Sequence, residues 1–314
     1  MRKNIVMYFR KRPLSHDPFA TFGTKRSVYH KFFQQGVLRG FNMFIASGEE
    51  NYRSPLLFRN AFMYSFDHFE PYKQDVYADS VFDRSGGLRF PPKEIGSKVL
   101  NCIEFKQLCN DKNAQKNILG KYMPESFCIH TQGDLSACIK KFNRRSKIVL
   151  KPARGMQGKG ILIDAPSKIA QFHIEDGSEY TLQEFVDTSL GIPKIANSHH
   201  DLRVVVVDGE IVLSHVREPK RGSLLANVAQ GGSIREIPLD AIPQFIQTVT
   251  QEIQSLLDKK YDFPLYSIDF GIQNKTTPFV FELNDQIGFP TEAMVGSELF
   301  IQRTLDSLKR RVDK

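Results

Sequence analysis

A glycine-rich basic stretch lies between two apolar runs in the middle of the chain, over residues 148–163, and reads IVLKPARGMQGKGILI. Two cations, Arg154 and Lys159, stand among three glycines, Gly155, Gly158 and Gly160. Glycine lets the backbone approach a ligand closely, and the cations indicate that this ligand is anionic. The stretch is not a P-loop, because glycine follows Lys159, and not a dinucleotide fingerprint, because a strand-like run follows it. It predicts a strand–loop–strand flap that can fold over phosphates, although a plain surface hairpin fits the stretch alone about equally well.

A second candidate group lies near the C-terminus, in the segment FVFELN. In a strand, Glu282 and Asn284 point to one face while Phe281 and Leu283 point to the other. Asp269 lies in YSIDFGI, which is predicted to be a neighbouring strand. Burying a carboxylate and an amide in an apolar strand is costly without a cation, and three hard oxygen ligands suit Mg²⁺ that bridges nucleotide phosphates. The alternative is an amphipathic strand whose polar face lies in solvent.

The elements that must position these residues are those of an α/β protein. Strands over residues 4–9 and 41–46 with a helix over 29–38 predict a βαβ unit. Residues 52–92 are irregular and rich in aromatics, remain unassigned, and end in GGLRFPP, which is interpreted as a connection between subdomains. The rest of the chain predicts helices over 110–120 and 245–257 and strands over 147–150, 160–163, 180–186, 202–207, 211–216, 266–272 and 278–283.

Composition is that of an ordinary soluble globular protein, with 41% apolar and 25% charged residues in 314. No run approaches the ~20 apolar residues of a membrane span, and the N-terminal apolar run is too short for a signal peptide. The net charge of +8 leaves a nucleic-acid-binding module open, but no long Lys/Arg block interleaved with aromatics supports it. Four cysteines without CxxC pairs or matching histidines indicate neither zinc nor disulfides, so free thiols in a reducing cytoplasm are expected: Cys102, Cys109, Cys128 and Cys138.

Taken in order, the motifs resemble the ATP-grasp superfamily, and most closely its glutathione-synthetase and RimK-like glutamate ligase branch. The resemblance covers roughly residues 110–288, and the first hundred residues match no motif of that branch. The motifs that carry it are NDKNAQKNILGKYMPES, VLKPARGMQGKGIL, LQEFV, HDLRVVVVDGEIVLSHVREP, SLLANVAQGG, SIDFGI and FELN.

The resemblance implies roles for individual residues. Phosphate contacts are implied for Lys112, Lys151 and the flap residues Arg154, Gly155, Gly158, Lys159 and Gly160. The adenine hinge is implied for Gln183, Glu184, Phe185 and Val186, with backbone groups of Glu184 and Phe185 reading the adenine edge. The resemblance implies that Asp201 binds the ribose and that Arg203 and Arg217 neutralise a carboxylate or an acyl phosphate. It implies that Asn227 lies near the phosphates. One or two Mg²⁺ (or Mn²⁺) would be held by Asp269, Glu282 and Asn284.

Two further expectations concern the exposure of side chains. The sequence also departs from the family pattern at two places expected to contact substrate. Lys151 is expected to face a solvent-filled cleft, and His200, beside Asp201, to be a solvated loop residue. The loop after the last metal ligand reads NDQIGFP, which is not the pattern usual in the family. Leu225 and Ala226 stand where the family usually has arginine and serine, so a cationic contact is missing and the amino-acid substrate is expected to differ.

The fold implied is α/β (α+β), an ATP-grasp fold with an N-terminal subdomain over residues 1–100 and an ATP-grasp domain over 101–314. Within that domain, a central lid is expected over about 110–187 and a metal-binding antiparallel sheet over about 188–305. The function implied is an ATP-dependent carboxylate–amine ligase that forms an amide or peptide bond through an acyl phosphate and releases ADP and phosphate. The alternative on the same fold is a phosphotransferase. The partners implied are a carboxylate substrate and an amine, with no membrane or nucleic acid and with oligomerisation left open.

Overall fold

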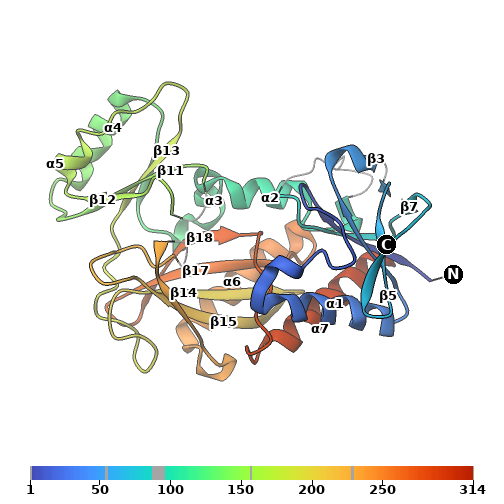
Figure 1. Ribbon diagram of the computed structural model, residues 1–314. Helices are drawn as coiled ribbons and strands as arrows, with labels where there is room; N and C mark the ends of the chain where they lie inside the picture. The colour runs from blue at the N-terminus through green and yellow to red at the C-terminus, as the bar shows by residue number, and fades with distance from the viewer. Residues whose placement is uncertain (1, 54–55, 87–95, 156–157, 228–229, 314) are drawn as a thin grey trace.

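The computed structural model describes residues 2–53, 56–86, 96–155, 158–227 and 230–313. Parts of three sequence motifs lie outside the described residues: 87–92 of GGLRFPP, 156–157 of the flap and 228–229 of SLLANVAQGG. Figure 1 shows an N-terminal α/β part, a lid that stands out from the body, and a C-terminal antiparallel sheet beneath the lid. Among the described residues, no helix combines the length and hydropathy needed to cross a bilayer.

The N-terminal part contains the predicted βαβ unit. Strand β1 (Asn4–Phe9) pairs in parallel with β2 (Asn42–Ser47), and α1 (Arg26–Leu38) connects them after the 3₁₀-helix η1 (Ala20–Lys25). The sheet has the order β6-β5-β2-β1-β8-β9, and its other strands are β5 (Phe62–Ser65), β6 (His68–Pro71), β8 (Ser80–Asp83) and β9 (Val99–Leu100). A small sheet of β3 (Tyr52–Arg53), β4 (Leu57–Phe58) and β7 (Val76–Tyr77) lies beside it. The described part of the segment over 52–92 therefore contains short strands of two to four residues joined by turns and loops.

Two helices replace the single one predicted over residues 110–120. Helix α2 (Ile103–Asn110) was not predicted, and α3 begins two residues late, over Lys112–Leu119. Asp111 between them is extended, with φ −126° and ψ 107°, and its carboxylate accepts hydrogen bonds from the N–H groups of Asn113 and Ala114. Asp111 is thus an N-cap, and it makes Lys112 the first residue of α3.

The lid is a four-stranded antiparallel sheet with its own hydrophobic core. Its order is β10-β13-β11-β12, from β10 (Ser126–Ile129), β11 (Ile148–Pro152), β12 (Leu162–Asp164) and β13 (Tyr180–Glu184), with α4 (Gln132–Ile139) and α5 (Pro166–Ile169) against it. Ile148, Leu150 and Leu182 lie in that core. Strands β11 and β12 pair antiparallel on either side of the flap, so the strand–loop–strand prediction is confirmed.

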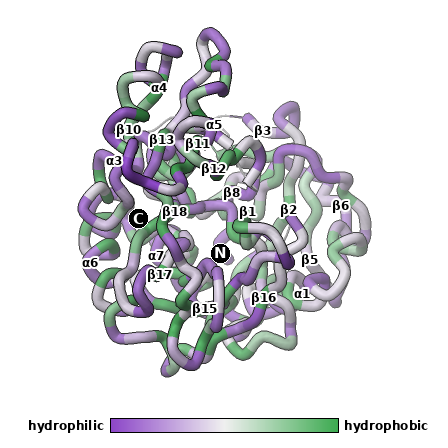
Figure 2. The backbone as a smooth tube through the Cα atoms, turned by 90° about the vertical axis from the view of Figure 1, so that its left-hand side faces the viewer, coloured by the Kyte–Doolittle hydropathy of each residue, from purple (hydrophilic) through white to green (hydrophobic). Residues whose placement is uncertain are grey.

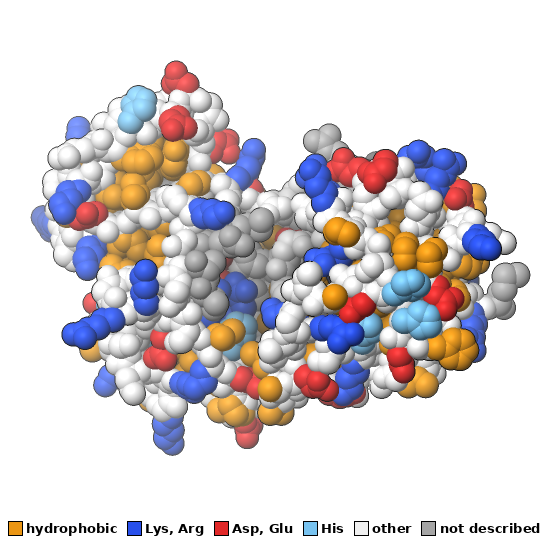
Figure 3. Space-filling model, viewed as in Figure 1, with side chains coloured by type: hydrophobic (Ala, Val, Ile, Leu, Met, Phe, Trp, Pro, Cys, Tyr) orange, Lys and Arg blue, Asp and Glu red, His pale blue; other side chains and the backbone are white. Residues whose placement is uncertain are grey.

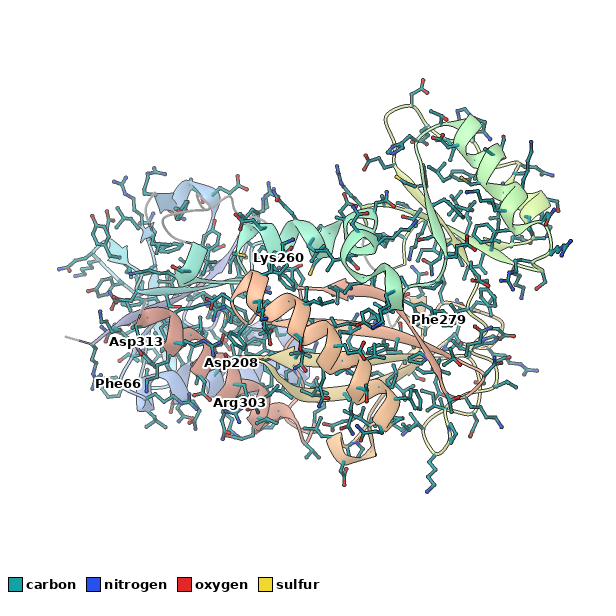
Figure 4. The ribbon with its side chains drawn as sticks, turned by 180° about the vertical axis from the view of Figure 1, so that it is seen from behind. Phe66, Asp208, Lys260, Phe279, Arg303 and Asp313 are labelled. Atoms are coloured by element: carbon teal, nitrogen blue, oxygen red, sulfur yellow. The ribbon has the colours of Figure 1, made fainter. Side chains whose placement is uncertain are left out.

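The C-terminal sheet has the order β16-β15-β14-β17-β18. Its strands are β14 (Asp201–Val207), β15 (Glu210–Glu218), β16 (Ser233–Glu236), β17 (Tyr266–Gln273) and β18 (Thr277–Asn284). Figure 4 shows α6 (Gln244–Tyr261) lying across one face, with Lys260 at one end of the helix. Helix α7 (Ser297–Val312) contacts β14 and β15 as well as β8, β9 and α1 of the N-terminal part.

Strand β14 shows that the two faces of this sheet belong to different hydrophobic cores. Leu202, Val204 and Val206 of β14 are buried in the core beneath α6. Val205 and Val207, on the opposite face, belong to a core shared with α7 and the N-terminal sheet. That second face becomes charged at Arg203 and Asp201, so its polar end lies toward the lid. Along the chain as a whole, Figure 2 shows hydrophobic tube in central strands and hydrophilic tube in many outer loops.

Candidate active site

A cavity of about 130 Å³ lies between the lid and the C-terminal sheet. Most of the predicted site residues line it: Lys112, Lys151, Gly155, Gly158, Lys159, Gln183, Glu184, Phe185, Val186, Asp201, Asn227, Asp269 and Glu282. Five predicted residues do not: Arg154, Gly160, Arg203, Arg217 and Asn284. The structure therefore brings the lysines, the hinge and two of the three predicted metal ligands to one cavity.

Two lysines stand on the lid side of this cavity. Lys112 Nζ donates to Gly155 O at 3.1 Å and lies 4.0 Å from Glu282 Oε2, and Lys151 Nζ donates to Phe281 O at 3.4 Å. Lys151 is only 6% exposed, so the expectation that it faces solvent is wrong. Burial lowers the pKa of Lys151 to about 8, opposed by the charge of Glu282 and assisted by that of Lys112. An anionic ligand would stabilise the charged form and raise this pKa again.

The flap reaches the loop that carries Asn227. Gly158 has φ +72°, and a Cβ there would lie 2.8 Å from Asn227 Oδ1, so only glycine fits this approach without a shift. Gly160, at φ +73°, packs against Pro152 and shapes the hairpin outside the cavity wall. The side chain of Arg154 is 72% exposed and pairs with Asp111 Oδ2 at 3.4 Å and with Glu179. The structure thus places Lys159, but not Arg154, at the cavity.

The hinge leaves the lid sheet at the end of β13. The Glu184 N–H donates to Glu125 O at 2.9 Å, and the Glu184 carboxylate pairs with Arg145 at 2.5 Å. These groups are therefore engaged within the lid, and any adenine contact would fall to the Glu184 carbonyl and to the backbone of Phe185 and Val186. Gln183 is buried, and its Oε1 has no hydrogen-bond partner among the described residues.

A charge network forms the floor below the cavity. Arg203 binds Asp269 through two hydrogen bonds of 2.6 Å, from Nε to Oδ1 and from Nη2 to Oδ2. Arg217 Nη2 donates to Asp269 Oδ2 at 2.7 Å and also to Asp201. Burial raises the pKa of Asp269, but the two arginines outweigh it and hold that pKa below its usual range. The predicted metal ligand is therefore ionised and fixed in orientation by two cations.

The pKa of Asp201 is shifted in the opposite direction to that of Asp269, because burial outweighs its contact with Arg217. Burial, with the neighbouring charge of Asp269, raises the pKa of Asp201 to about 6 despite the Arg217 contact. Its Oδ1 is buried without a hydrogen-bond partner among the described residues. One oxygen thus remains available to a ligand hydroxyl, as the ribose prediction requires.

The three predicted metal ligands converge at the edge of the sheet. Asp269 and Glu282 are paired positions on β17 and β18, and Asn284 Nδ2 lies 3.3 Å from both Asp269 Oδ2 and Glu282 Oε1. Two carboxylates beside an amide that can turn its oxygen inward fit a hard cation such as Mg²⁺. In the described part of the chain, no group of three or more His, Cys, Asp or Glu could hold a metal ion. The candidate metal site therefore needs the amide oxygen of Asn284 as its third ligand.

Two histidines near the cavity are more buried than the sequence suggested. His200 lines the cavity at 3% exposure, and burial lowers its pKa, so the expectation of a solvated loop residue is wrong. His215 was not predicted as a site residue. It is the cross-strand neighbour of Arg203, and burial together with Arg203 and Arg217 lowers its pKa to about 3. The signal was present, because His215 and Arg217 alternate in SHVRE and so share a face.

The two departures from the family pattern lie at the cavity wall and directly after the candidate metal ligands. Leu225 and Ala226 line the cavity next to Asn227 and present an apolar surface there. The loop NDQIGFP contacts the N-terminal part, since Arg84 Nη2 donates to Ile287 O at 2.7 Å. The unmatched N-terminal third therefore reaches the loop that follows the candidate metal ligands.

Comparison with known families decides the classification, because residues 106–301 match the RimK-like ATP-grasp domain. The chain belongs to the family of RimK-like ATP-grasp domains. The resemblance to this branch and the ATP-grasp fold are thereby confirmed. This RimK-like chain is 24% identical over 170 residues to a probable alpha-L-glutamate ligase of Shewanella halifaxensis (strain HAW-EB4), a match that covers 52% of this chain and 33% of the relative. The chain thus matches about a third of the length of that curated relative.

Solved structures show the same fold over the whole RimK-like chain. D-alanyl-alanine synthetase A from Vibrio cholerae O1 biovar eltor str. N16961 superposes with a TM-score of 0.64 at 13% identity, covering 100% of this chain and 99% of that one. The RimK domain protein ATP-grasp from Sphaerobacter thermophilus DSM 20745 gives a TM-score of 0.57 at 12% identity, with coverage of 99% and 98%. At such identities the likeness shows the fold alone, including the N-terminal part that the motifs did not reach.

Proposed function

We propose that this chain is an ATP-dependent carboxylate–amine ligase that releases ADP and phosphate. The observation that carries the proposal is the arrangement of charge across the cavity. Two buried lysines on the lid side, Lys112 and Lys151, face the carboxylates of Glu282 and Asp269 on the sheet side. Cations opposite acidic groups suit a nucleotide polyphosphate together with a divalent metal. Membership in the RimK-like family supports the same function.

The proposal assigns each part of the nucleotide to a part of the cavity. Adenine would lie against the hinge at Glu184, Phe185 and Val186, and ribose against the free Oδ1 of Asp201. The phosphates would lie between the two lysines, with Gly155, Gly158 and Lys159 of the flap above them. Asp269, Glu282 and Asn284 would hold Mg²⁺, or Mn²⁺, which neutralises phosphate charge when bound.

In the proposed reaction, a carboxylate oxygen of the substrate attacks the γ-phosphorus of ATP, and ADP leaves. The amine nitrogen then attacks the acyl carbon of the resulting acyl phosphate, loses a proton, and expels phosphate that carries one former carboxylate oxygen. The chain contributes positioning and charge neutralisation, which are the main requirements of phosphoryl transfer. Arg203 and Arg217 are bound to Asp269 in this structure, so contact with the substrate carboxylate would use the N–H groups that these ion pairs leave over, such as those of Arg203 Nη1.

The relative named a probable alpha-L-glutamate ligase supports an amino acid as one of the two substrates. The four described cysteines are free, which favours a reducing compartment such as the cytoplasm.

An ADP-release screen tests this function. Pairs of acids and amines are offered with Mg²⁺-ATP, with each acid and each amine also supplied alone. A ligase releases ADP at an appreciable rate only when a competent acid and amine are both present, and an amide product accumulates. Acid-dependent ADP release with a stable phosphorylated product and no effect of amine would replace the ligase with a phosphotransferase.

A further inference from the structure

The buried side chain of Gln115 binds the backbone between two of the candidate metal ligands. The Leu283 N–H donates to Gln115 Oε1 at 2.7 Å, and Gln115 Nε2 donates to Leu283 O at 3.2 Å and to Cys109 O at 2.8 Å. Leu283 stands between Glu282 and Asn284 at the end of β18. Two of the three hydrogen bonds of this amide therefore hold the segment that carries the candidate ligands.

The position of β18 explains why this segment needs a side-chain partner. It is the last strand in the order of the C-terminal sheet, and α3 contacts it (Figure 1). Backbone N–H and C=O groups on the outer edge of such a strand must find partners elsewhere when they are buried. Both Leu283 and Gln115 are fully buried, at 0% exposure. An apolar side chain at position 115 would fill the space but would leave two buried backbone groups unpaired.

The ladder that holds β18 from its other side is irregular beside the candidate ligands. Its register shifts between Asp269 and Phe270, next to the pairing of Asp269 with Glu282, and β18 ends at Asn284. A strand end beside such an irregularity is held by a locally disrupted ladder. The Gln115 contacts therefore restrain the segment at the point where the ladder restrains it least.

Helix α3 carries both this amide and one of the cavity lysines. Lys112 is the first residue of α3, and its Nζ lies 4.0 Å from Glu282 Oε2. Gln115 follows three residues later, on the same side of the helix. In Figure 3 the molecule is hollowed between the lid and the N-terminal part, and Lys, Arg and His side chains are visible in the hollow. Gln115 is closed off from solvent, so it can act on a bound ligand only through the strand that it holds.

We propose that Gln115 is a positioning residue for the metal site, which orients Glu282 and Asn284 by holding both backbone groups of Leu283. The side chain of Leu283 lies in the hydrophobic core, and its two neighbours in the strand point to the opposite face. Fixing the Leu283 backbone therefore fixes the direction in which both neighbouring side chains leave the strand. The inference rests on the proposed ligase function, because it takes these residues to hold the Mg²⁺ that accompanies ATP. Residues that hold metal ligands in place typically contribute about tenfold to a hundredfold to metal affinity.

The test compares calorimetric titrations of ADP into the intact chain in saturating Mg²⁺ and in EDTA. The ratio of the two affinities measures how much the bound metal contributes to nucleotide binding. In Gln115→Met this ratio should fall about tenfold or more, whereas the ADP affinity in EDTA should not change, because Lys112 and Lys151 remain in place. Gln115→Asn keeps a buried amide that is one methylene too short to reach both groups of Leu283, and it should lower the ratio as well.

Two further variants serve as controls. Gln254 of α6 is 9% exposed, and its Nε2 donates to Gly209 O at 2.9 Å, beyond the end of β14 that lies away from the cavity. Gln254→Met should lower the melting temperature as Gln115→Met does, but it should leave the ratio unchanged. Glu282→Gln removes a candidate ligand directly and should lower the ratio with little change in melting temperature.

A Gln115 variant that melts cooperatively and keeps the wild-type ratio would overturn the positioning role. The role would also fail if Gln254→Met lowered the ratio equally, since the effect would then be general destabilisation. Absence of any effect of Mg²⁺ on ADP binding to the wild type would overturn it together with the metal site. A ratio that depends on Gln115, without amine-dependent ADP release for any acid, would leave the positioning role standing and remove the ligase function instead.

Discussion

Replacing Lys151 with methionine should make the nucleotide-free protein more stable and at the same time weaken nucleotide binding. The side chain is 6% exposed, and its pKa falls from 10.5 to about 8 on burial. Each pKa unit corresponds to about 1.4 kcal/mol, so the charged lysine costs about 3 kcal/mol at neutral pH. The variant also loses the weak hydrogen bond to Phe281 O, and this loss offsets about 1 kcal/mol of the stabilisation. Lys151→Met keeps most of the aliphatic stem, and the net gain is on the order of 2 kcal/mol.

The sign of this effect depends on pH in a specific way. Because the folded-state pKa is the lower one, the unfolded chain keeps a proton between pH 8 and 10.5 that the folded chain has released. The stability of the wild type should therefore rise with pH across that window relative to Lys151→Met, and the advantage of the variant should disappear before pH 10.5 is reached. Lys73→Met is the control that removes an exposed lysine.

Thermal unfolding with and without Mg²⁺-ATP measures both halves of this prediction. Without nucleotide at pH 7, the variant should melt on the order of 5 °C higher than the wild type. With nucleotide, the wild type should gain more, because a tenfold to hundredfold loss of affinity reduces ligand stabilisation of the variant. A variant that is less stable than the wild type without nucleotide, or one that keeps the full nucleotide-induced rise, would refute the reasoning.

Three further predictions test separate parts of the structure. Glu282→Gln should retain the fold and lower turnover at least a hundredfold at fixed Mg²⁺, as measured by ADP release across a Mg²⁺ titration; near-normal turnover would remove this residue from the metal site. Lys106→Met should destabilise the protein by about 3–5 kcal/mol in denaturant unfolding, because it leaves two buried carboxylates unpaired, and an unchanged midpoint would contradict this. Gly158→Ala and Gly177→Ala both place alanine at positive φ, but only the new Cβ at position 158 would clash with Asn227. Turnover should therefore fall severalfold in Gly158→Ala alone. Equal losses in the two variants would count against contact between the flap and the Asn227 loop.

The long strands of the C-terminal sheet could be predicted from the sequence to within two residues. The strand predicted over 202–207 is Asp201–Val207, and the one over 278–283 is Thr277–Asn284. Both are runs of mainly apolar, β-branched and aromatic residues, and β14 is buried along nearly its whole length, so composition reveals each element. The candidate metal ligands stand out for a related reason, since Glu282 and Asn284 interrupt the apolar run of β18.

Shorter and capped elements could not be predicted. Strands such as β3 and β4 have two residues each, which is less than one period of any pattern. The break between α2 and α3 depends on the Asp111 side chain, which caps the second helix inside a stretch that is otherwise helical in pattern. Such a cap wins over local propensity only because α3 packs against the rest of the molecule.

Within the site, residue types could be predicted but pairings could not. Arg203 and Arg217 were expected to face substrate, yet both bind Asp269 across neighbouring strands. Arg84 lies 203 residues before Ile287, the residue it contacts, so no local pattern could place it beside the substrate-side loop. Long-range contacts of this kind come from the docking of the N-terminal sheet through α7.

The transfer of one carboxylate oxygen to phosphate is the most direct test of reaction through an acyl phosphate. A competent acid labelled with ¹⁸O in its carboxylate is turned over with ATP and amine, and the products are analysed by mass spectrometry. Attack of the carboxylate on the γ-phosphorus requires that inorganic phosphate carry one ¹⁸O and that ADP carry none. Label in AMP, with pyrophosphate as the co-product, would mean adenylation at the α-phosphorus and would contradict the proposed mechanism.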